Sequence, residues 1–281
     1  MSTSSRPLPP VLARFYDTPP TETGPGTETW ICRAANFVVT VSRVAAGAVL
    51  TRDNPDEYVL LSNDLAATVT AGTTGAETIE AAPDSLTIVP PGESRIVART
   101  AGTLARVFSA HATDLAAKAA NAADYANGAP LVAPLGEWPA PKGGYRLRTY
   151  ALADHVTEGS FLRVFRTANL MVNPLVPWAA ARDVHKLSPH SHGDFEQASL
   201  ALESTWIHHL RTPWTADMDD WVDDLHAEIG SPSVTVIPPT IVHTSRNIAP
   251  MGRLVDVFAP PRLDFLQQGV VRNADDYPMP A

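Results

Sequence analysis

Cysteine is almost absent from this chain of 281 residues, in which Cys32 is the single thiol. One cysteine excludes an internal disulfide and is typical of a protein from the reducing cytoplasm. No apolar run reaches the ~18 residues that a membrane helix needs. The N-terminal stretch also lacks the basic region and apolar core of a secretory signal. We therefore expect a cytoplasmic protein that does not enter a membrane.

Basic residues are scattered, and the formal net charge is −9. Nucleic acids and anionic membranes bind basic patches, so neither is expected as a partner. P-loops, dinucleotide glycine patterns and Ser/His/Asp nucleophile signatures are missing as well, so no organic cofactor is predicted. The expected partner is a small-molecule substrate, and a homodimer stays an open alternative.

Proline and glycine, by contrast, are plentiful, with 26 and 16 residues. This composition favours many short strands joined by turns over long helices. Segments rich in β-branched and apolar residues predict strands. These segments are 37–41, 57–61, 85–89, 161–166, 169–172, 234–237 and 254–258.

Two segments predict short helices. Residues 113–126 are rich in alanine, with Gly128 after the end as a C-cap. Residues 217–229 begin with aspartates and place Trp221, Leu225 and Ile229 four apart, which predicts an amphipathic helix. Such a helix would either cover the mouth of the neighbouring barrel as a lid or pack on its outside.

The pattern that carries most chemistry is His190-x-His192-x-x-x-Glu196, followed by His243. On a strand, side chains at i and i+2 share a face, so these four groups converge if the two segments are neighbours in a small barrel. Three imidazoles and a carboxylate suit iron(II), manganese, nickel, cobalt, copper or zinc. A metal with open positions is catalytic more often than structural.

These two segments together resemble the motifs of the cupin superfamily. The first family motif is a glycine, H-x-H, three or four further residues, a glutamate and a later glycine. The second is P-x-G-x-x-H with an asparagine behind it, matched here by Pro238, His243 and Asn247. The two turn glycines of the family are missing, because Glu203-Ser204 and Thr240 stand in their places.

The resemblance implies a double-stranded β-helix barrel with one divalent transition metal per chain, iron(II) being favoured. The ligands that it implies are His190, His192, Glu196 and His243. His208 and His209 follow the motif as strand neighbours, so at most one of them faces the barrel interior.

The spacing of both motifs recurs in the N-terminal half, where Glu57 takes the place of Glu196. Non-ligating or weaker side chains would replace the imidazoles, and a guanidinium cannot bind a cation. The residues at the three histidine positions are Thr51, Asp53 and Arg95.

The repeat predicts an all-β protein of two cupin barrels with a few short helices. Residues 1–128 would form a degenerate, metal-free N-terminal barrel with a proline-rich arm. Residues 129–144 would be a linker, and residues 145–281 would form the metal-binding barrel.

The function that the resemblance implies first is a non-haem iron dioxygenase acting on a small organic molecule. A non-redox metal-dependent isomerase, lyase or decarboxylase is the alternative, in which the metal acts as a Lewis acid. A third reading is a small-ligand-binding cupin without turnover. Catalytic residues other than the metal ligands are not predicted.

Overall fold

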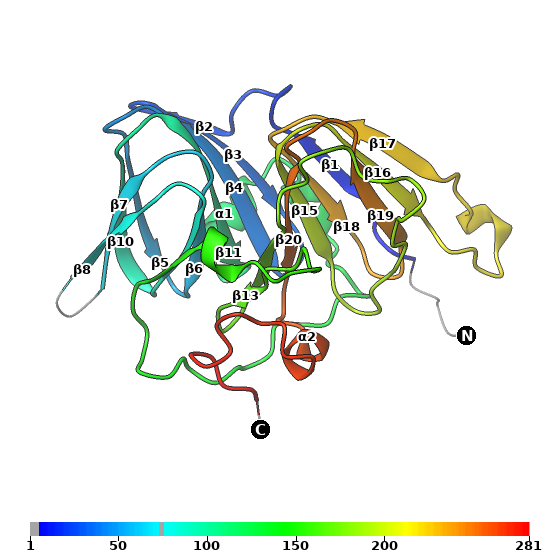
Figure 1. Ribbon diagram of the computed structural model, residues 1–281. Coiled ribbons are helices and arrows are strands. Elements are labelled where there is room, and N and C mark those ends of the chain that lie inside the picture. The colour runs from blue at the N-terminus through cyan, green and yellow to red at the C-terminus, as the bar shows by residue number, and fades with distance from the viewer. Residues whose placement is uncertain (1–5, 73–75, 281) are drawn as a thin grey trace.

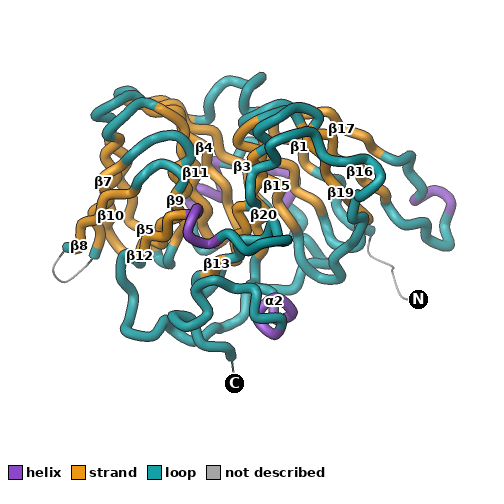
Figure 2. The backbone as a smooth tube through the Cα atoms, viewed as in Figure 1, coloured by secondary structure: helices purple, strands orange, loops and turns teal. Residues whose placement is uncertain are grey.

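The computed structural model describes residues 6–72 and 76–280. The protein consists of two β-barrel halves that lie side by side, and its helices are few and short (Figures 1 and 2). The predicted all-β class is therefore confirmed. None of the helices within these ranges has the length and apolar character that crossing a bilayer requires.

The N-terminal half pairs a seven-stranded sheet with a four-stranded sheet, and all strand pairs are antiparallel. The larger sheet runs in the order β12 (Arg148–Ala151), β9 (Ser85–Val89), β6 (Tyr58–Ser62), β11 (Gly102–Ser109), β4 (Phe37–Val44), β3 (Thr27–Arg33), β2 (Glu22–Gly24). The smaller sheet runs β5 (Val49–Asn54), β10 (Gly92–Ala98), β7 (Ala67–Ala71), β8 (Glu77–Ala81).

The C-terminal half repeats this plan with six and three strands. Its larger sheet runs in the order β1 (Val11–Arg14), β18 (Ser233–Ile237), β15 (Gln197–Glu203), β20 (Arg253–Phe258), β14 (Met171–Pro174), β13 (Phe165–Arg166). The smaller sheet runs β17 (Leu225–Ile229), β16 (Trp206–Arg211), β19 (Val242–Asn247).

Each half completes its large sheet with a strand from the other part of the chain. Strand β1, in the N-terminal arm, pairs with β18 of the C-terminal half. Strand β12, which follows the expected linker, pairs with β9 of the N-terminal half. Residues 129–144 themselves contain no helix or strand. The exchange ties the two barrels together through strands from both parts of the chain.

The helix predicted over 113–126 forms as two pieces, α1 (Thr113–Lys118) and the 3-10 helix η1 (Ala122–Tyr125). The remaining short helices are η2 (Leu152–His155), η3 (Met218–Asp220) and α2 (Leu263–Gln267).

The helix predicted over 217–229 is wrong. Only η3 is helical there, and β17 pairs with β16 instead. Residues four apart share a face on a strand as well as on a helix, so the apolar spacing did not distinguish the two. Trp221 stacks on Trp214 with ring centroids 4.4 Å apart, at the outer end of this hairpin.

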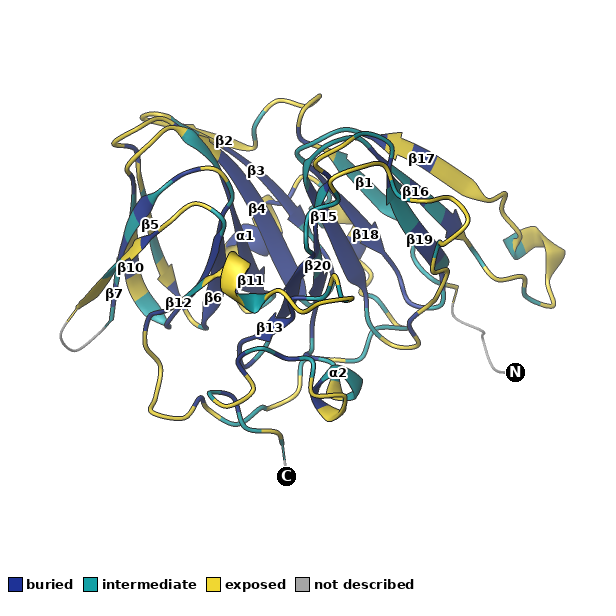
Figure 3. Cartoon of the chain, in the orientation of Figure 1, coloured by how far each residue is buried: buried dark blue, intermediate teal, exposed yellow. Residues whose placement is uncertain are grey.

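The largest apolar cluster lies between the two halves, where the two large sheets pack face to face (Figure 3). It includes Val59 and Val107 from one sheet and Leu200 and Val257 from the other, all at most 1% exposed. Alternate residues on the same strands point into the barrels. The N-terminal barrel is filled with a second apolar cluster, whereas the C-terminal barrel presents polar groups such as Gln197 to its interior.

Candidate metal centre

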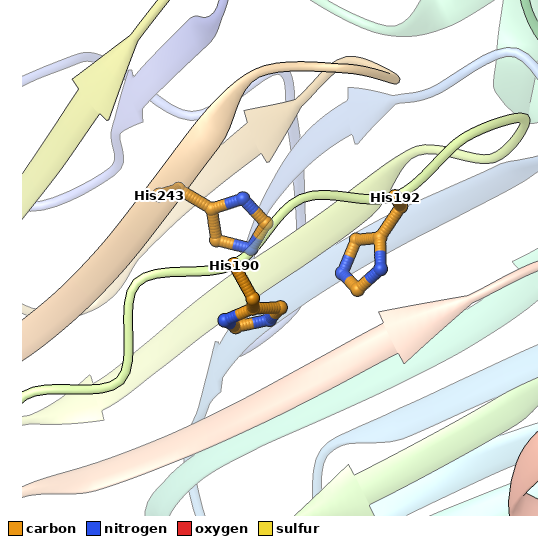
Figure 4. A group of neighbouring side chains, drawn as sticks. All are labelled: His190, His192 and His243. Carbon is orange, nitrogen blue, oxygen red and sulfur yellow. The ribbon is translucent and has the colours of Figure 1, made fainter.

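Three of the four predicted ligands meet in the C-terminal barrel, where His192 and His243 are buried and His190 is exposed. The imidazole nitrogens of His190, His192 and His243 lie within 4.8 Å of one another (Figure 4). The backbones of His190 and His243 form a reciprocal pair of hydrogen bonds, 3.0 and 2.7 Å long, which holds the two motif segments side by side. Among residues 6–72 and 76–280 this is the one cluster of three or more potential metal ligands.

Backbone carbonyl groups orient two of the rings. Nδ1 of His190 donates to the carbonyl oxygen of Ser188 over 2.9 Å, and Nδ1 of His243 donates to Ile241 over 3.0 Å. A proton on Nδ1 leaves Nε2 as a free lone pair, the arrangement found in metal-ligating histidines.

Burial also keeps the imidazoles neutral. It lowers the pKa of His192 to about 3 and the pKa of His243 to about 4. The positive charge is disfavoured because the surrounding protein solvates it poorly. Neutral imidazole is the form that binds a metal, so the site requires no loss of protons from these two rings at neutral pH.

Glu196, the fourth predicted ligand, lies outside this cluster. Its carboxylate accepts hydrogen bonds from the backbone amide of Ala35 (2.6 Å) and the hydroxyl of Tyr125 (2.9 Å), both in the N-terminal half. The neighbouring residue, Gln197, points into the barrel, and its Oε1 lies 2.9 Å from Nε2 of His192 and 3.4 Å from Nε2 of His243. Successive residues of an extended chain face opposite ways. Glu196 therefore points to the interface with the N-terminal half, and Gln197 points to the histidines.

Gln197 connects the histidines to the half-buried carboxyl group of Asp256, which lines the adjoining cavity. Its Nε2 donates to Asp256 over 3.0 Å and to Ser199 over 3.1 Å. Burial raises the pKa of Asp256 to about 7, an effect that hydrogen bonds from Ser199 and Asn173 partly offset. Sequence reasoning missed Asp256, because nothing local distinguishes it from other strand aspartates.

A cavity of about 130 Å³ adjoins these groups. His190, His243, Gln197 and Asp256 line it, together with two arginines. Arg182 reaches it from the loop before the first motif, held by hydrogen bonds to the carbonyl of Ser245 (2.7 Å) and to Ser188 (2.9 Å).

The second arginine of the cavity, Arg262, is paired with Asp264. Its guanidinium lies 4.1 Å from the ring centroid of Phe265. Arg182 has no ion pair to a carboxylate among the described residues, and it interacts only at longer range with Asp256, which lines the same cavity.

The residues present fit a divalent first-row metal. Three neutral imidazoles would supply nitrogen donors, and the amide oxygen of Gln197 lies where a fourth donor would stand. A metal bound by these residues would lie beside the cavity, where a substrate could reach it.

The residues at the two positions where the family motif has turn glycines both have a positive φ. Ser204 has φ of 75° and Thr240 has φ of 69°, both in the left-handed region. Glycine adopts this region without cost, and a β-branched residue rarely does. Both turns therefore adopt the left-handed conformation that glycine favours, and Thr240 donates its amide proton to the carbonyl of His192 over 2.6 Å.

The N-terminal residues expected at the ligand positions do not face their barrel. Thr51, Asp53 and Arg95 are all exposed, and Asn54 and Ser94 next to them are buried. The prediction that these three side chains point into the barrel is therefore wrong. On a strand, a shift of one residue moves a side chain from the inner to the outer face of the sheet.

His208 is the one of its pair that faces inward. It is fully buried, and its Nδ1 lies 2.7 Å from Oγ of Ser245. His209 lies on the outer face, where its Nδ1 is 2.8 Å from Nδ1 of His226. Trp221 does not line the cavity at the histidines, so the predicted lid is not formed by this segment.

Comparisons with known proteins identify the fold. No protein-family profile matches the chain, and no characterised protein matches its sequence. Among solved structures, a variant of oxalate decarboxylase from Bacillus subtilis is 14% identical, with a TM-score of 0.60 over 98% of this chain and 87% of that one.

A second structure of that enzyme, from a study of its Mn(II) centres, is 14% identical with a TM-score of 0.58 over 96% and 85% of the two chains. AerE from Microcystis aeruginosa is 7% identical with a TM-score of 0.55 over 91% and 99%. At these identities the likeness establishes the fold, and the chain has the all-β cupin fold.

Proposed function

We propose that this protein is a metal-dependent decarboxylase of a small carboxylic acid. The observation that carries the proposal is the charge of the cavity. Gln197 stands where the predicted set had a carboxylate, so the donor set is neutral, and Arg182 adds a positive charge beside it. A bound dication would keep its full charge, and the cavity would attract an anion.

The size of the cavity limits the substrate. A volume of about 130 Å³ equals roughly four water molecules at ~30 Å³ each. An acid of a few non-hydrogen atoms fits such a space. The planar guanidinium of Arg182 suits a carboxylate, because two parallel N–H groups match its two oxygens.

The residues of the chain provide a proton route for this reaction. Loss of CO₂ leaves the bonding electron pair on the substrate carbon, which then needs a proton. Asp256 lines the cavity and holds a proton near pH 7. It would donate that proton to carbon and regain one from solvent, while Gln197 holds its carboxyl group in place. When bound, a divalent ion would supply Lewis-acid stabilisation of charge on the substrate oxygens.

The oxalate decarboxylase neighbours favour this reading over the dioxygenase. That enzyme shares the fold, and its Mn(II) centres make manganese the first metal to test.

One assay distinguishes the alternatives. The protein as purified is analysed for metals, then loaded with Mn(II) or Fe(II) and offered oxalate, glyoxylate, pyruvate and malonate. We expect CO₂ release without net oxygen consumption, lost in His192→Ala and reduced at least tenfold in Arg182→Gln. Stoichiometric oxygen uptake would establish the dioxygenase instead. Tight binding without product would indicate a binding protein.

A further inference from the structure

His208 is a buried histidine that neither the metal centre nor the proposed reaction uses. It projects into the C-terminal barrel from β16 and is 0% exposed. In the sheet register it lies directly opposite Ser245 of β19. Its Nδ1 lies 2.7 Å from Oγ of Ser245, and its Nε2 has no hydrogen-bond partner among the described residues. The contact with Ser245 therefore accounts for all the hydrogen bonding of this ring within the described chain.

The hydrogen bond between His208 and Ser245 has a direction that burial decides. Burial lowers the pKa of His208 to about 3, with smaller contributions from His243 and His209. The ring is therefore neutral and carries one proton, on Nδ1 or on Nε2. A buried N–H group without an acceptor is rare in folded proteins, whereas an acceptor without a donor is tolerated more often. The proton is therefore expected on Nδ1, which donates it to Oγ of Ser245.

This direction leaves the hydroxyl proton of Ser245 free. A hydroxyl group has one donor and two acceptor lone pairs, and His208 occupies one of the lone pairs. Oγ of Ser245 has no other hydrogen-bond partner in the described part of the chain. The opposite tautomer would reverse the bond, because Ser245 would then donate to His208 and offer only lone pairs. The tautomer of a buried ring thus determines whether Ser245 is a donor or an acceptor.

Ser245 lines the same cavity of about 130 Å³ as Arg182, beside the histidine cluster. Nη1 of Arg182 donates to the carbonyl oxygen of Ser245 over 2.7 Å, so the guanidinium is anchored on this very residue. A guanidinium has five N–H donors, and the bonds to Ser245 and Ser188 leave the others available. The hydroxyl of Ser245 and the guanidinium of Arg182 are therefore neighbouring donors on one cavity.

We propose that Ser245 binds the substrate carboxylate as a hydrogen-bond donor beside Arg182, and that His208 is the positioning residue that fixes this direction. The inference rests on the proposed function, because it names a residue that selects the acid in the cavity. Two neighbouring donors favour a group that only accepts hydrogen bonds, as a carboxylate does. A carboxamide or an ammonium group would present N–H donors to these donors.

The tautomer of His208 is measured by nitrogen NMR. The full-length protein, isotopically labelled at the histidine nitrogens and loaded with diamagnetic Zn(II), gives different signals for protonated and unprotonated ring nitrogens. The signals of His208 are those that disappear in His208→Phe or, if that variant does not fold, those that change in Ser245→Ala. We expect the proton on Nδ1, and a proton on Nε2 overturns the proposal.

Binding of oxalate is measured by calorimetry on full-length protein that holds its metal and no excess ion. Ser245→Ala should weaken the affinity about tenfold, because a hydrogen bond to a charged group is lost. Ser245→Thr keeps the hydroxyl and should keep the affinity. His208→Phe fills the same space without Nδ1, and it should weaken the affinity less than Ser245→Ala because the hydroxyl remains but loses its orientation.

Ser233→Ala is the matched control. Ser233 carries a buried hydroxyl on β18 of the same half and does not line the cavity, so its variant should bind oxalate as the wild type does. Unchanged affinity in Ser245→Ala, an equal loss in Ser233→Ala, or no oxalate binding by the wild type overturns the proposal. Wild-type affinity in His208→Phe overturns the positioning role of His208.

Turnover separates this inference from the proposed function. Where CO₂ is released, Ser245→Ala should raise KM about tenfold and leave kcat nearly unchanged, because the contact is made in the ground state and the transition state alike. CO₂ release with an unchanged KM in Ser245→Ala overturns the inference and leaves the proposed function standing. Oxalate binding that depends on Ser245, without release of CO₂ from any acid, supports the inference and refutes the decarboxylase.

Discussion

Glu57 and Glu196 occupy equivalent places in the two halves of the chain, and each reaches into the opposite half. Glu57 accepts hydrogen bonds from the Tyr277 hydroxyl (2.8 Å) and the Ala168 amide (3.2 Å). Glu196 accepts the same pair of bonds from Tyr125 and Ala35. The repeated glutamate therefore joins the barrels, and this role explains its recurrence at the same motif spacing without any metal.

Replacing Glu196 by Ala should separate interface stability from metal binding. The change leaves the buried Tyr125 hydroxyl without its acceptor, so we expect a loss of about 1–3 kcal/mol in the free energy of unfolding. Metal content should stay unchanged. Denaturant unfolding and elemental analysis measure the two quantities.

His192→Ala is the matched comparison, because it removes a site imidazole and should lose most of the metal. Glu196→Ala protein that has lost its metal as completely as His192→Ala would contradict the position of Glu196 outside the site.

Thr240→Gly should stabilise the protein. The left-handed backbone at φ 69° costs a residue with a Cβ atom about 1 kcal/mol, and glycine adopts it freely. Thr240→Ala retains the Cβ and should gain little. Ser204→Gly should gain less than Thr240→Gly, because the Ser204 hydroxyl donates to the Ala249 carbonyl over 3.0 Å. Unfolding midpoints that rank the three variants otherwise would argue against this account.

Asp256 should make the metal-free protein less stable as the pH rises. Its folded-state pKa of about 7 lies above the ordinary value of ~3.9. The stability that the protonated carboxyl contributes is complete below pH ~4 and is lost as the pH rises through about 7. Asp256→Asn lacks this titration, so the wild type should lose stability relative to the variant between pH 4 and 8. The exposed Asp154→Asn is the control, and a constant difference for Asp256→Asn would refute the shift.

Gly252→Ala should disturb the cavity indirectly, through Asn247 and the loop that carries Arg182. An added Cβ would come within 2.9 Å of the Asn247 side chain, whose Oδ1 accepts from the Arg182 amide over 3.1 Å. Overpacking of this kind costs about 1–3 kcal/mol, and displacement of Asn247 should shift the loop that carries Arg182.

Weaker substrate binding at unchanged metal content is the expected signature of that shift. Gly136→Ala is the control, since nothing lies within 4 Å of its added Cβ. Equal behaviour of the two variants would show that the space behind Asn247 can relax.

The sequence by itself determined the elements whose signals are local. Strand segments such as 85–89 coincide with β9, because β-branched runs bounded by prolines and glycines allow few other conformations. The histidines of the site were also identifiable from their motif spacing, but His190 and His192 lie in the loop before β15, where an isolated bridge between His190 and His243 brings the two segments together.

Only the tertiary structure decided which face each neighbour takes. Gln197 enters the site and Glu196 leaves it, and Thr51, Asp53 and Arg95 lie on the outer face of their sheet. A shift of one residue exchanges the faces of a strand, and pairing with distant strands sets that register. The same holds for β1 and β17, whose partners are chosen by long-range sheet hydrogen bonds, and for Asp256, whose pKa follows from burial that only packing creates.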